Sequence, residues 1–152
     1  MTKDKMQDGV AVLLEHASFR YANSDFSAVK DVSLTIQKGE AVLLCGESGC
    51  GKTTLTRLIN GLIPQYYEGE FSGDVRVCGL DVAKAELYET ARLVGSVFQN
   101  PRSQFFCVDV TSEIAFGCEN FCMPEETVRA RITEASEETG TTEILGKNIF
   151  HL

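Results

Sequence analysis

One glycine-rich stretch constrains the fold of this chain more than any other segment. Residues 46–54 read Gly-Glu-Ser-Gly-Cys-Gly-Lys-Thr-Thr and fit the pattern G-x-x-x-x-G-K-[ST]. This pattern is typical of a loop that surrounds the phosphates of a nucleotide, provided that a strand precedes the loop and a helix follows it. The alternative is a glycine-rich turn with a structural role only.

The segments on both sides of the loop match this requirement. Residues 41–45 form an unbroken apolar run, which predicts a strand buried on both faces. After the loop, apolar residues recur at helical spacing at Leu55, Leu58, Ile59 and Leu62. Gly61 and Pro64 then predict the end of this helix. The order of strand, loop and helix therefore favours phosphate binding.

Each residue type in the loop has a chemical reason to be there. Glycines allow positive φ angles, so that successive N–H groups turn inward toward an anion, and the helix N-terminus adds a partial positive charge. Lys52 is predicted to reach the β- and γ-phosphates, and the Thr53 hydroxyl to bind Mg²⁺. The predicted nucleotide-binding residues are Gly46, Glu47, Ser48, Gly49, Cys50, Gly51, Lys52, Thr53 and Thr54.

Length and composition narrow the class of protein. A chain of 152 residues with 43% hydrophobic residues predicts one globular domain with a real core. Its apolar runs are far shorter than the 18 or so residues of a membrane span, and we expect none. The first eight residues are polar and lack the apolar region of a signal peptide, so a cytoplasmic location is expected.

The net charge argues against a nucleic-acid surface, and the cysteine spacing argues against a metal site. The net charge of −8 argues against a nucleic-acid surface, but not against a phosphate site built from backbone dipoles and one lysine. The six cysteines include no C-x-x-C pair and are interpreted as small buried residues in a reducing compartment.

Hydrophobic periodicity predicts the remaining elements. Alternating residues predict strands over 10–21 and 31–37 and around Val75 and Val77, and an apolar run predicts another strand over 93–98. A short helix is expected over 83–90, another from Thr111 or Ser112, and a third from Pro124 to Gly140. An antiparallel layer is thus expected around the phosphate loop.

With these elements placed, the chain resembles the ATP-binding subunit of an ABC transporter over nearly its whole length. The resemblance is greatest to the energy-coupling-factor group, which drives uptake of vitamins, cobalt or nickel. It implies an α/β fold of the P-loop NTPase type, with an antiparallel β layer, a partial RecA-like core and the start of a helical subdomain. The stretches that carry it are the phosphate loop, Phe19-Arg20-Tyr21, Asn60-Gly61-Leu62-Ile63-Pro64, Val97-Phe98-Gln99-Asn100-Pro101 with Gln104, and Glu113-Ile114-Ala115-Phe116-Gly117.

The resemblance also implies roles for two residues outside the loop. Tyr21 matches the aromatic residue that stacks on adenine, and its alternative is an ordinary strand aromatic. Gln99 matches the glutamine that contacts Mg²⁺ and the attacking water, and its alternative is a polar residue in a proline-containing turn. Arg102 and Ser103 replace an acidic or amide pair often seen beyond this glutamine, which puts the partner contacts of the loop in question.

The chain departs from the family by what it lacks. Residues 1–152 are expected to be a single nucleotide-binding domain, with the β layer and core in 1–100 and the glutamine loop and the first helices in 101–152. We expect the domain to be truncated before its signature motif, because the sequence contains neither the Walker B glutamate, nor that motif, nor the switch histidine. Asp81 resembles the Walker B aspartate only weakly and is interpreted as a turn residue. This chain alone is therefore expected not to hydrolyse ATP.

By resemblance, the function is that of the ATPase subunit of a membrane importer for a small nutrient such as a vitamin or metal ion. The implied cofactors are ATP and Mg²⁺, and the implied partners are transmembrane subunits and a second ATPase subunit at the inner face of the membrane. Two alternatives remain. One is a soluble ABC-type ATPase of DNA repair or translation, and the other is a small P-loop phosphotransferase.

Overall fold

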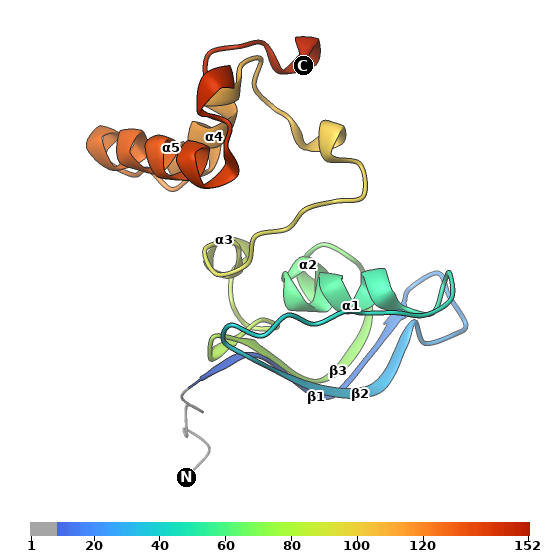
Figure 1. Ribbon diagram of the computed structural model, residues 1–152. Helices are drawn as coiled ribbons and strands as arrows, with labels where there is room; N and C mark the ends of the chain where they lie inside the picture. The colour runs from blue at the N-terminus through green and yellow to red at the C-terminus, as the bar shows by residue number, and fades with distance from the viewer. Residues whose placement is uncertain (1–8) are drawn as a thin grey trace. The chain divides into compact units, whose positions relative to one another are not determined.

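A computed structural model describes residues 9–152, which form two compact units with the boundary between Ser96 and Val97. The first unit contains four strands and three short helices, and the second contains two longer helices and three 3₁₀ turns (Figure 1). The elements of the first unit are β1 (Val10–Tyr21), β2 (Val29–Gln37), α1 (Lys52–Ile59), α2 (Leu62–Gln65), β3 (Gly69–Val77), β4 (Leu80–Asp81) and α3 (Leu87–Ala91). Those of the second are η1 (Pro101–Gln104), α4 (Val110–Asn120), α5 (Glu125–Thr139), η2 (Thr142–Ile144) and η3 (Ile149–His151).

The first unit is built on an antiparallel sheet with the strand order β2-β1-β3-β4. Leu14 of the central strand β1 lies opposite Leu34 of β2 and Val75 of β3. The strands predicted over 10–21 and 31–37 and around Val75 are confirmed. In β2 the predicted alternation also appears, with half-buried residues at every second position between exposed ones.

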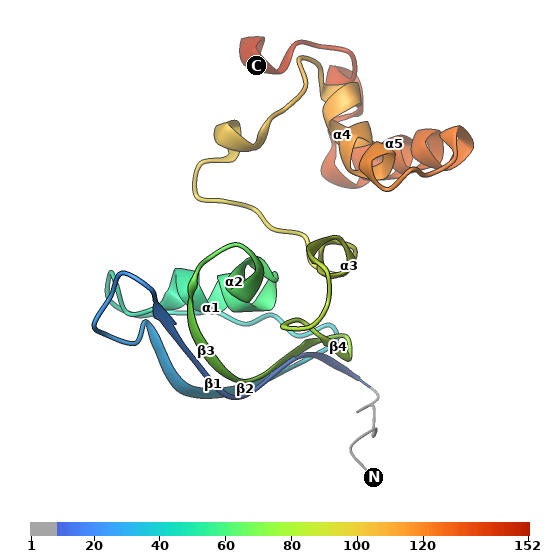
Figure 2. The same cartoon turned by 180° about the vertical axis from the view of Figure 1, so that it is seen from behind.

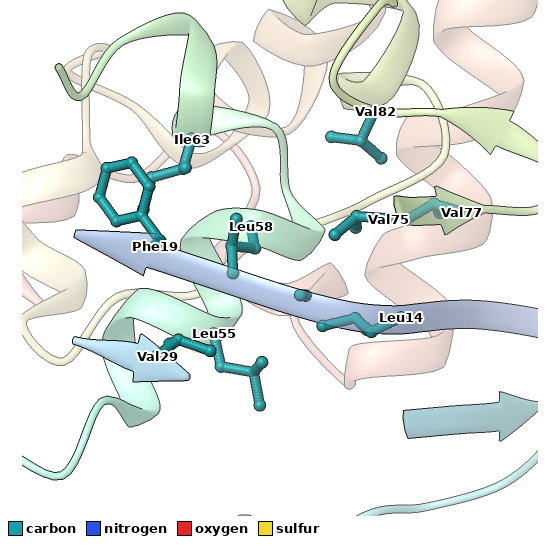
Figure 3. Packing of buried hydrophobic residues seen from close by; sticks show 10 residues of the cluster. Leu14, Phe19, Val29, Leu55, Leu58, Ile63, Val75, Val77 and Val82 are labelled. Atoms are coloured by element: carbon teal, nitrogen blue, oxygen red, sulfur yellow. The ribbon is translucent and has the colours of Figure 1, made fainter. Parts of the chain in front are cut away.

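The core of this unit lies between the sheet and the helices α1 and α2, which cover one face of the sheet (Figures 1 and 2). The helix predicted after the loop is confirmed as α1, and its apolar face buries Leu55 and Leu58. These side chains pack in one cluster with residues from β1, β2, β3 and the start of α2, including Leu14, Phe19, Val29, Val75 and Ile63 (Figure 3). Burial of this cluster removes apolar surface from water and fixes α1 on the sheet.

Two of the predicted strands are wrong. Residues 41–45 and 93–98 form no strand, and both runs are largely exposed, with Leu43 and Val97 each 86% exposed. A strand is stable only when a neighbour pairs with its backbone groups. Within residues 9–152, no strand pairs with either run. Apolar composition predicts a strand in these segments, but it does not supply the neighbouring strand that they need.

The helical part of the second unit follows the prediction closely. Helices α4 and α5 lie side by side (Figure 2). Asp109 caps α4 by accepting a hydrogen bond from the Ser112 N–H at 2.9 Å, so this helix begins slightly before the predicted Thr111. Pro124 precedes α5, and Gly140 ends it in the left-handed conformation, as predicted.

The interpretation of the cysteines as buried residues is wrong. Four of them are exposed and two are half-buried, and all six are free thiols. Cys45 belongs to the unpaired apolar run, while Cys78 and Cys122 have positive φ angles at a turn and beyond the end of a helix. The sequence placed these residues in the core because cysteine is usually buried, whereas their backbone positions hold them at the surface.

Candidate nucleotide-binding site

The glycine-rich loop leads directly into helix α1. Gly51 is the N-cap of this helix, with φ +95°, and the Leu55 N–H donates to its carbonyl at 2.9 Å. A Cβ atom at Gly51 would overlap the carbonyl oxygen of Ala28 and lie 3.3 Å from its carbonyl carbon. Only glycine fits there without a shift, because both the backbone angle and the close approach exclude a side chain. The start of α1 is thereby fixed against the segment that enters β2.

The ammonium group of Lys52 lies at the loop. Its Nζ donates to the carbonyl oxygens of Gly46 at 2.8 Å and Glu47 at 2.6 Å, and it lies 3.5 Å from the Sγ of Cys50. Lys52 is also the first residue of α1, so its charge and the positive end of the helix dipole occur in the same part of the chain. This combination is suited to an anion such as a phosphate group.

The two threonines that follow Lys52 have different surroundings. Thr53 is exposed, and its hydroxyl is an oxygen of the type that Mg²⁺ prefers. Thr54 is 6% exposed, and its Oγ1 lies 3.1 Å from the hydroxyl oxygen of Tyr21. Of the two threonines, Thr53 is thus exposed, whereas the hydroxyl of Thr54 is engaged with Tyr21 of strand β1.

Tyr21 lies at the end of β1 in a cluster of aromatic rings. Its hydroxyl oxygen accepts a hydrogen bond from Arg57 Nη1 at 2.8 Å. Its ring forms edge-to-face contacts with Phe19, at 4.8 Å between ring centroids, and with Tyr67, at 6.0 Å. The Arg57 guanidinium carbon lies 4.1 Å from the centre of the Tyr67 ring. The structure therefore brings Tyr21 together with Thr54 of the phosphate loop.

Gln99 lies in the second unit, at an exposed bend before η1. The loop that carries it is closed by side chains. The Phe98 N–H donates to Gln104 Oε1 at 2.9 Å, and the Ser103 hydroxyl donates to the Asn100 carbonyl at 2.7 Å. Gln99 thus lies in a loop whose two ends are joined by hydrogen bonds. Its predicted role with Mg²⁺ stays a prediction.

Two acidic residues outside the loop have local structural contacts. Glu113 Oε2 accepts hydrogen bonds from the N–H groups of Phe106 and Cys107, at 3.0 and 2.8 Å. Burial, reinforced by the Glu113 charge, raises the pKa of the Cys107 thiol. Asp81, interpreted from the sequence as a turn residue, is instead the last residue of β4, directly before a turn, where it accepts from the Ala83 N–H at 3.2 Å and pairs with Lys84. Burial acts to raise the pKa of Asp81, but the hydrogen bond and charge of Lys84, the Ala83 N–H and the charge of Arg76 together lower it below its ordinary value.

Sequence reasoning missed Arg57 and Tyr67 as neighbours of the site. Arg57 follows Thr54 by three residues, so helical spacing places both on the same side of α1. That spacing was a usable signal for Arg57. The contact of Tyr67 with Arg57 depends on the path of the chain between α2 and β3, for which the sequence offers no comparable pattern.

Comparison with known proteins identifies the family. A family model described as ABC transporter matches residues 29–151. The chain belongs to the ABC transporter family. A protein of Treponema denticola described as an ABC transporter ATP-binding protein is 47% identical over 141 residues, covering 93% of this chain and 29% of the relative. A Methanosarcina acetivorans protein with the same description is 43% identical over 141 residues, covering 93% of this chain and 23% of the relative.

A solved structure supports the same assignment. CbiO1 from Clostridium perfringens, described as part of the ABC transporter complex CbiONQ, matches with a TM-score of 0.81 and 25% identity, covering 95% of this chain and 56% of CbiO1. The predicted family and the α/β P-loop NTPase fold are thereby confirmed. The chain spans less than a third of the length of these curated relatives. No helix within residues 9–152 is both long and apolar enough to cross a membrane.

Proposed function

We propose that this chain binds Mg-ATP at residues 46–54 and is the nucleotide-binding part of an ABC-type ATPase subunit. The observation that carries the proposal is the position of the Lys52 ammonium, bonded to the Gly46 and Glu47 carbonyls at the N-terminus of α1. A lysine and a helix N-terminus at one loop favour a polyphosphate through point charge and backbone dipoles together. Membership of the ABC transporter family makes ATP the expected polyphosphate.

The residues present fit a magnesium ion that is held mainly by the nucleotide. Within residues 9–152, no group of three or more His, Cys, Asp or Glu side chains could hold a metal by itself. Magnesium in nucleotide sites is usually bound by one or two protein oxygens together with phosphates and water. The exposed hydroxyl of Thr53 would supply one such oxygen, and by the family resemblance Gln99 would supply another. When bound, the ion would neutralise charge on the phosphates.

For the whole protein we propose ATP hydrolysis coupled to uptake of a small nutrient such as a vitamin or metal ion. The proposal is supported by the similarity to CbiO1, which is part of the transporter complex CbiONQ. Transmembrane subunits and a second ATPase subunit are the corresponding proposed partners, at the inner face of the cell membrane. Co-purification of the full-length protein with a polytopic membrane protein would test this part independently of nucleotide binding.

Titration calorimetry tests the nucleotide site directly. We expect the wild-type chain to bind Mg-ATP and the Lys52→Ala variant to bind it at least about tenfold more weakly, because a charge-assisted contact contributes about 1.5–3 kcal/mol. Lys84→Ala removes the same charge from a lysine that pairs with Asp81, and we expect it to leave ATP affinity unchanged. Equal affinity of wild type and Lys52→Ala, with both folded, would refute the site.

A further inference from the structure

Arg57, on the short helix α1, contacts two aromatic side chains. Its guanidinium donates to the Tyr21 hydroxyl and lies over the Tyr67 ring. Within residues 9–152, no carboxylate forms an ion pair with Arg57. The charge of this side chain is therefore directed to two aromatic residues rather than to an acid. We propose that Arg57 is a positioning residue, which orients Tyr21 at the nucleotide site.

The donors and acceptors of these side chains determine the direction of the hydrogen bond between Arg57 and Tyr21. A guanidinium group has donors only, so the Tyr21 oxygen must accept from Arg57. The phenol proton can then be donated to Thr54 Oγ1, 3.1 Å away. Arg57 and Thr54 lie three residues apart on α1, so the Tyr21 oxygen is held by the same helix at two points. A charged donor at one end strengthens such a chain of hydrogen bonds.

Arg57 is itself restrained by the aromatic cluster. The planar guanidinium lies over Tyr67, a cation–π arrangement that lysine reproduces less well. Tyr67 in turn forms an edge-to-face contact with Tyr21 and packs against the buried core. The orientation of the Tyr21 side chain is therefore set by a fixed cation rather than by a mobile one. Thr54 connects this arrangement to the phosphate loop, in which it is the last residue.

This inference rests on the proposed function and makes it more specific. If Tyr21 contacts the base of ATP, loss of Arg57 should weaken the interaction with the base and leave the interaction with phosphates intact. An effect on the fold alone would weaken both. Inorganic tripolyphosphate carries the phosphates without the base, so the ratio of its affinity to that of ATP separates these two cases.

The experiment is titration calorimetry of Mg-ATP and of magnesium tripolyphosphate against the 152-residue chain. For Arg57→Met we expect ATP affinity to fall about tenfold, or about 1.4 kcal/mol, while tripolyphosphate affinity changes less than about twofold. Lys38→Met is the matched control, because it removes one positive charge from an exposed turn, and we expect it to bind both ligands as wild type. Equal losses for the two ligands, or no loss for ATP, would overturn the inference.

A double-mutant cycle shows whether Arg57 acts through Tyr21. We expect Tyr21→Phe to weaken ATP binding by itself, and Arg57→Met to cause less than about a twofold further loss when added to it. Full additivity would contradict the proposed route. Should Arg57→Met fail to fold, Arg57→Lys keeps the charge without the planar group, and it should still show a selective loss of ATP affinity.

The same titrations separate a failure of this inference from a failure of the proposed function. Lys52→Ala should weaken the binding of both ligands. If wild type binds neither ligand, or Lys52→Ala binds both as well as wild type does, the proposed nucleotide site is wrong and this inference falls with it. If Lys52→Ala behaves as expected but Arg57→Met is not selective for ATP, only the role of Arg57 is wrong.

Discussion

Replacing Gly51 by alanine tests how the phosphate loop is attached to the sheet. The added Cβ atom would meet the backbone of Ala28 and lie 3.6 Å from Cγ2 of Val29. Because the nearest atoms belong to the main chain, no rotation of a side chain relieves the overlap. Gly49 is the matched control, since it also has a positive φ angle, +83°, but a Cβ atom there would meet nothing within 4 Å.

We expect the two substitutions to differ in energy mainly through the overlap with Ala28. Both place an L-residue in a left-handed conformation, which costs about 1–2 kcal/mol. Gly51→Ala adds the overlap with Ala28, and forcing an extra carbon into a packed site costs about 1–3 kcal/mol more. We therefore expect the free energy of unfolding to fall by about 1–2 kcal/mol for Gly49→Ala, and by about 2–5 kcal/mol for Gly51→Ala.

The aromatic residues provide a selective assay. The chain has no tryptophan, and its four tyrosines all lie before residue 97, so tyrosine fluorescence in urea reports on the first unit alone. We also expect Gly51→Ala to weaken ATP binding more than Gly49→Ala does, since it displaces the first turn of α1. Equal losses of stability in the two variants would show that the approach to Ala28 does not restrain the loop, and would refute this reasoning.

Two further predictions concern the exposed apolar run and the start of α4. Because residues 42–44 are apolar and exposed, we expect the purified chain to self-associate. Leu43→Ser should weaken this association at least about tenfold, as measured by analytical ultracentrifugation. Phe26→Ser is the control, because Phe26 is exposed but isolated, and it should leave the association unchanged. Hydrogen bonds from the Ser112 N–H and hydroxyl lower the pKa of Asp109 below its usual 3.8. The ionised cap is therefore fully effective above that pH and is lost as the pH falls through the lowered pKa. The protection factors of the amides in the first turn of α4 should fall over that range in wild type but not in Asp109→Asn, and a fall in both would contradict the assignment.

The parts of the fold that sequence predicted well depend on local patterns. The phosphate loop, α1 and α5 each combine a helical apolar spacing with a residue that starts or ends the helix, such as Gly51 or Gly140. Strand β2 alternates in character along residues 31–37, and β1 alternates at Ala17, Phe19 and Tyr21, because one face packs on the core. Such signals are contained in short segments and need no knowledge of what lies next to them.

The contacts of Tyr21 could not be predicted from local sequence patterns. The sequence assigned Tyr21 to adenine by resemblance, and stacking involves the face of the ring only. In the structure, the hydroxyl joins Arg57 and Thr54, which lie more than 30 residues along the chain. These contacts depend on the packing of α1 across β1, and no periodicity within either element indicates which side chains will meet there.

The failure of the predicted strand at residues 41–45 changes how the loop is held. A paired strand would have anchored the loop on its N-terminal side, whereas within residues 9–152 only the C-terminal side is anchored, by α1 and by the approach of Gly51 to Ala28. Lys52 joins the two sides, because its ammonium bonds the Gly46 and Glu47 carbonyls from the first turn of the helix. Lys52 thus both supplies charge for a phosphate and closes the loop that would receive it. The loss in Lys52→Ala should accordingly combine a missing charge with a looser loop, and Lys52→Arg, which keeps the charge but not the compact ammonium, would separate the two.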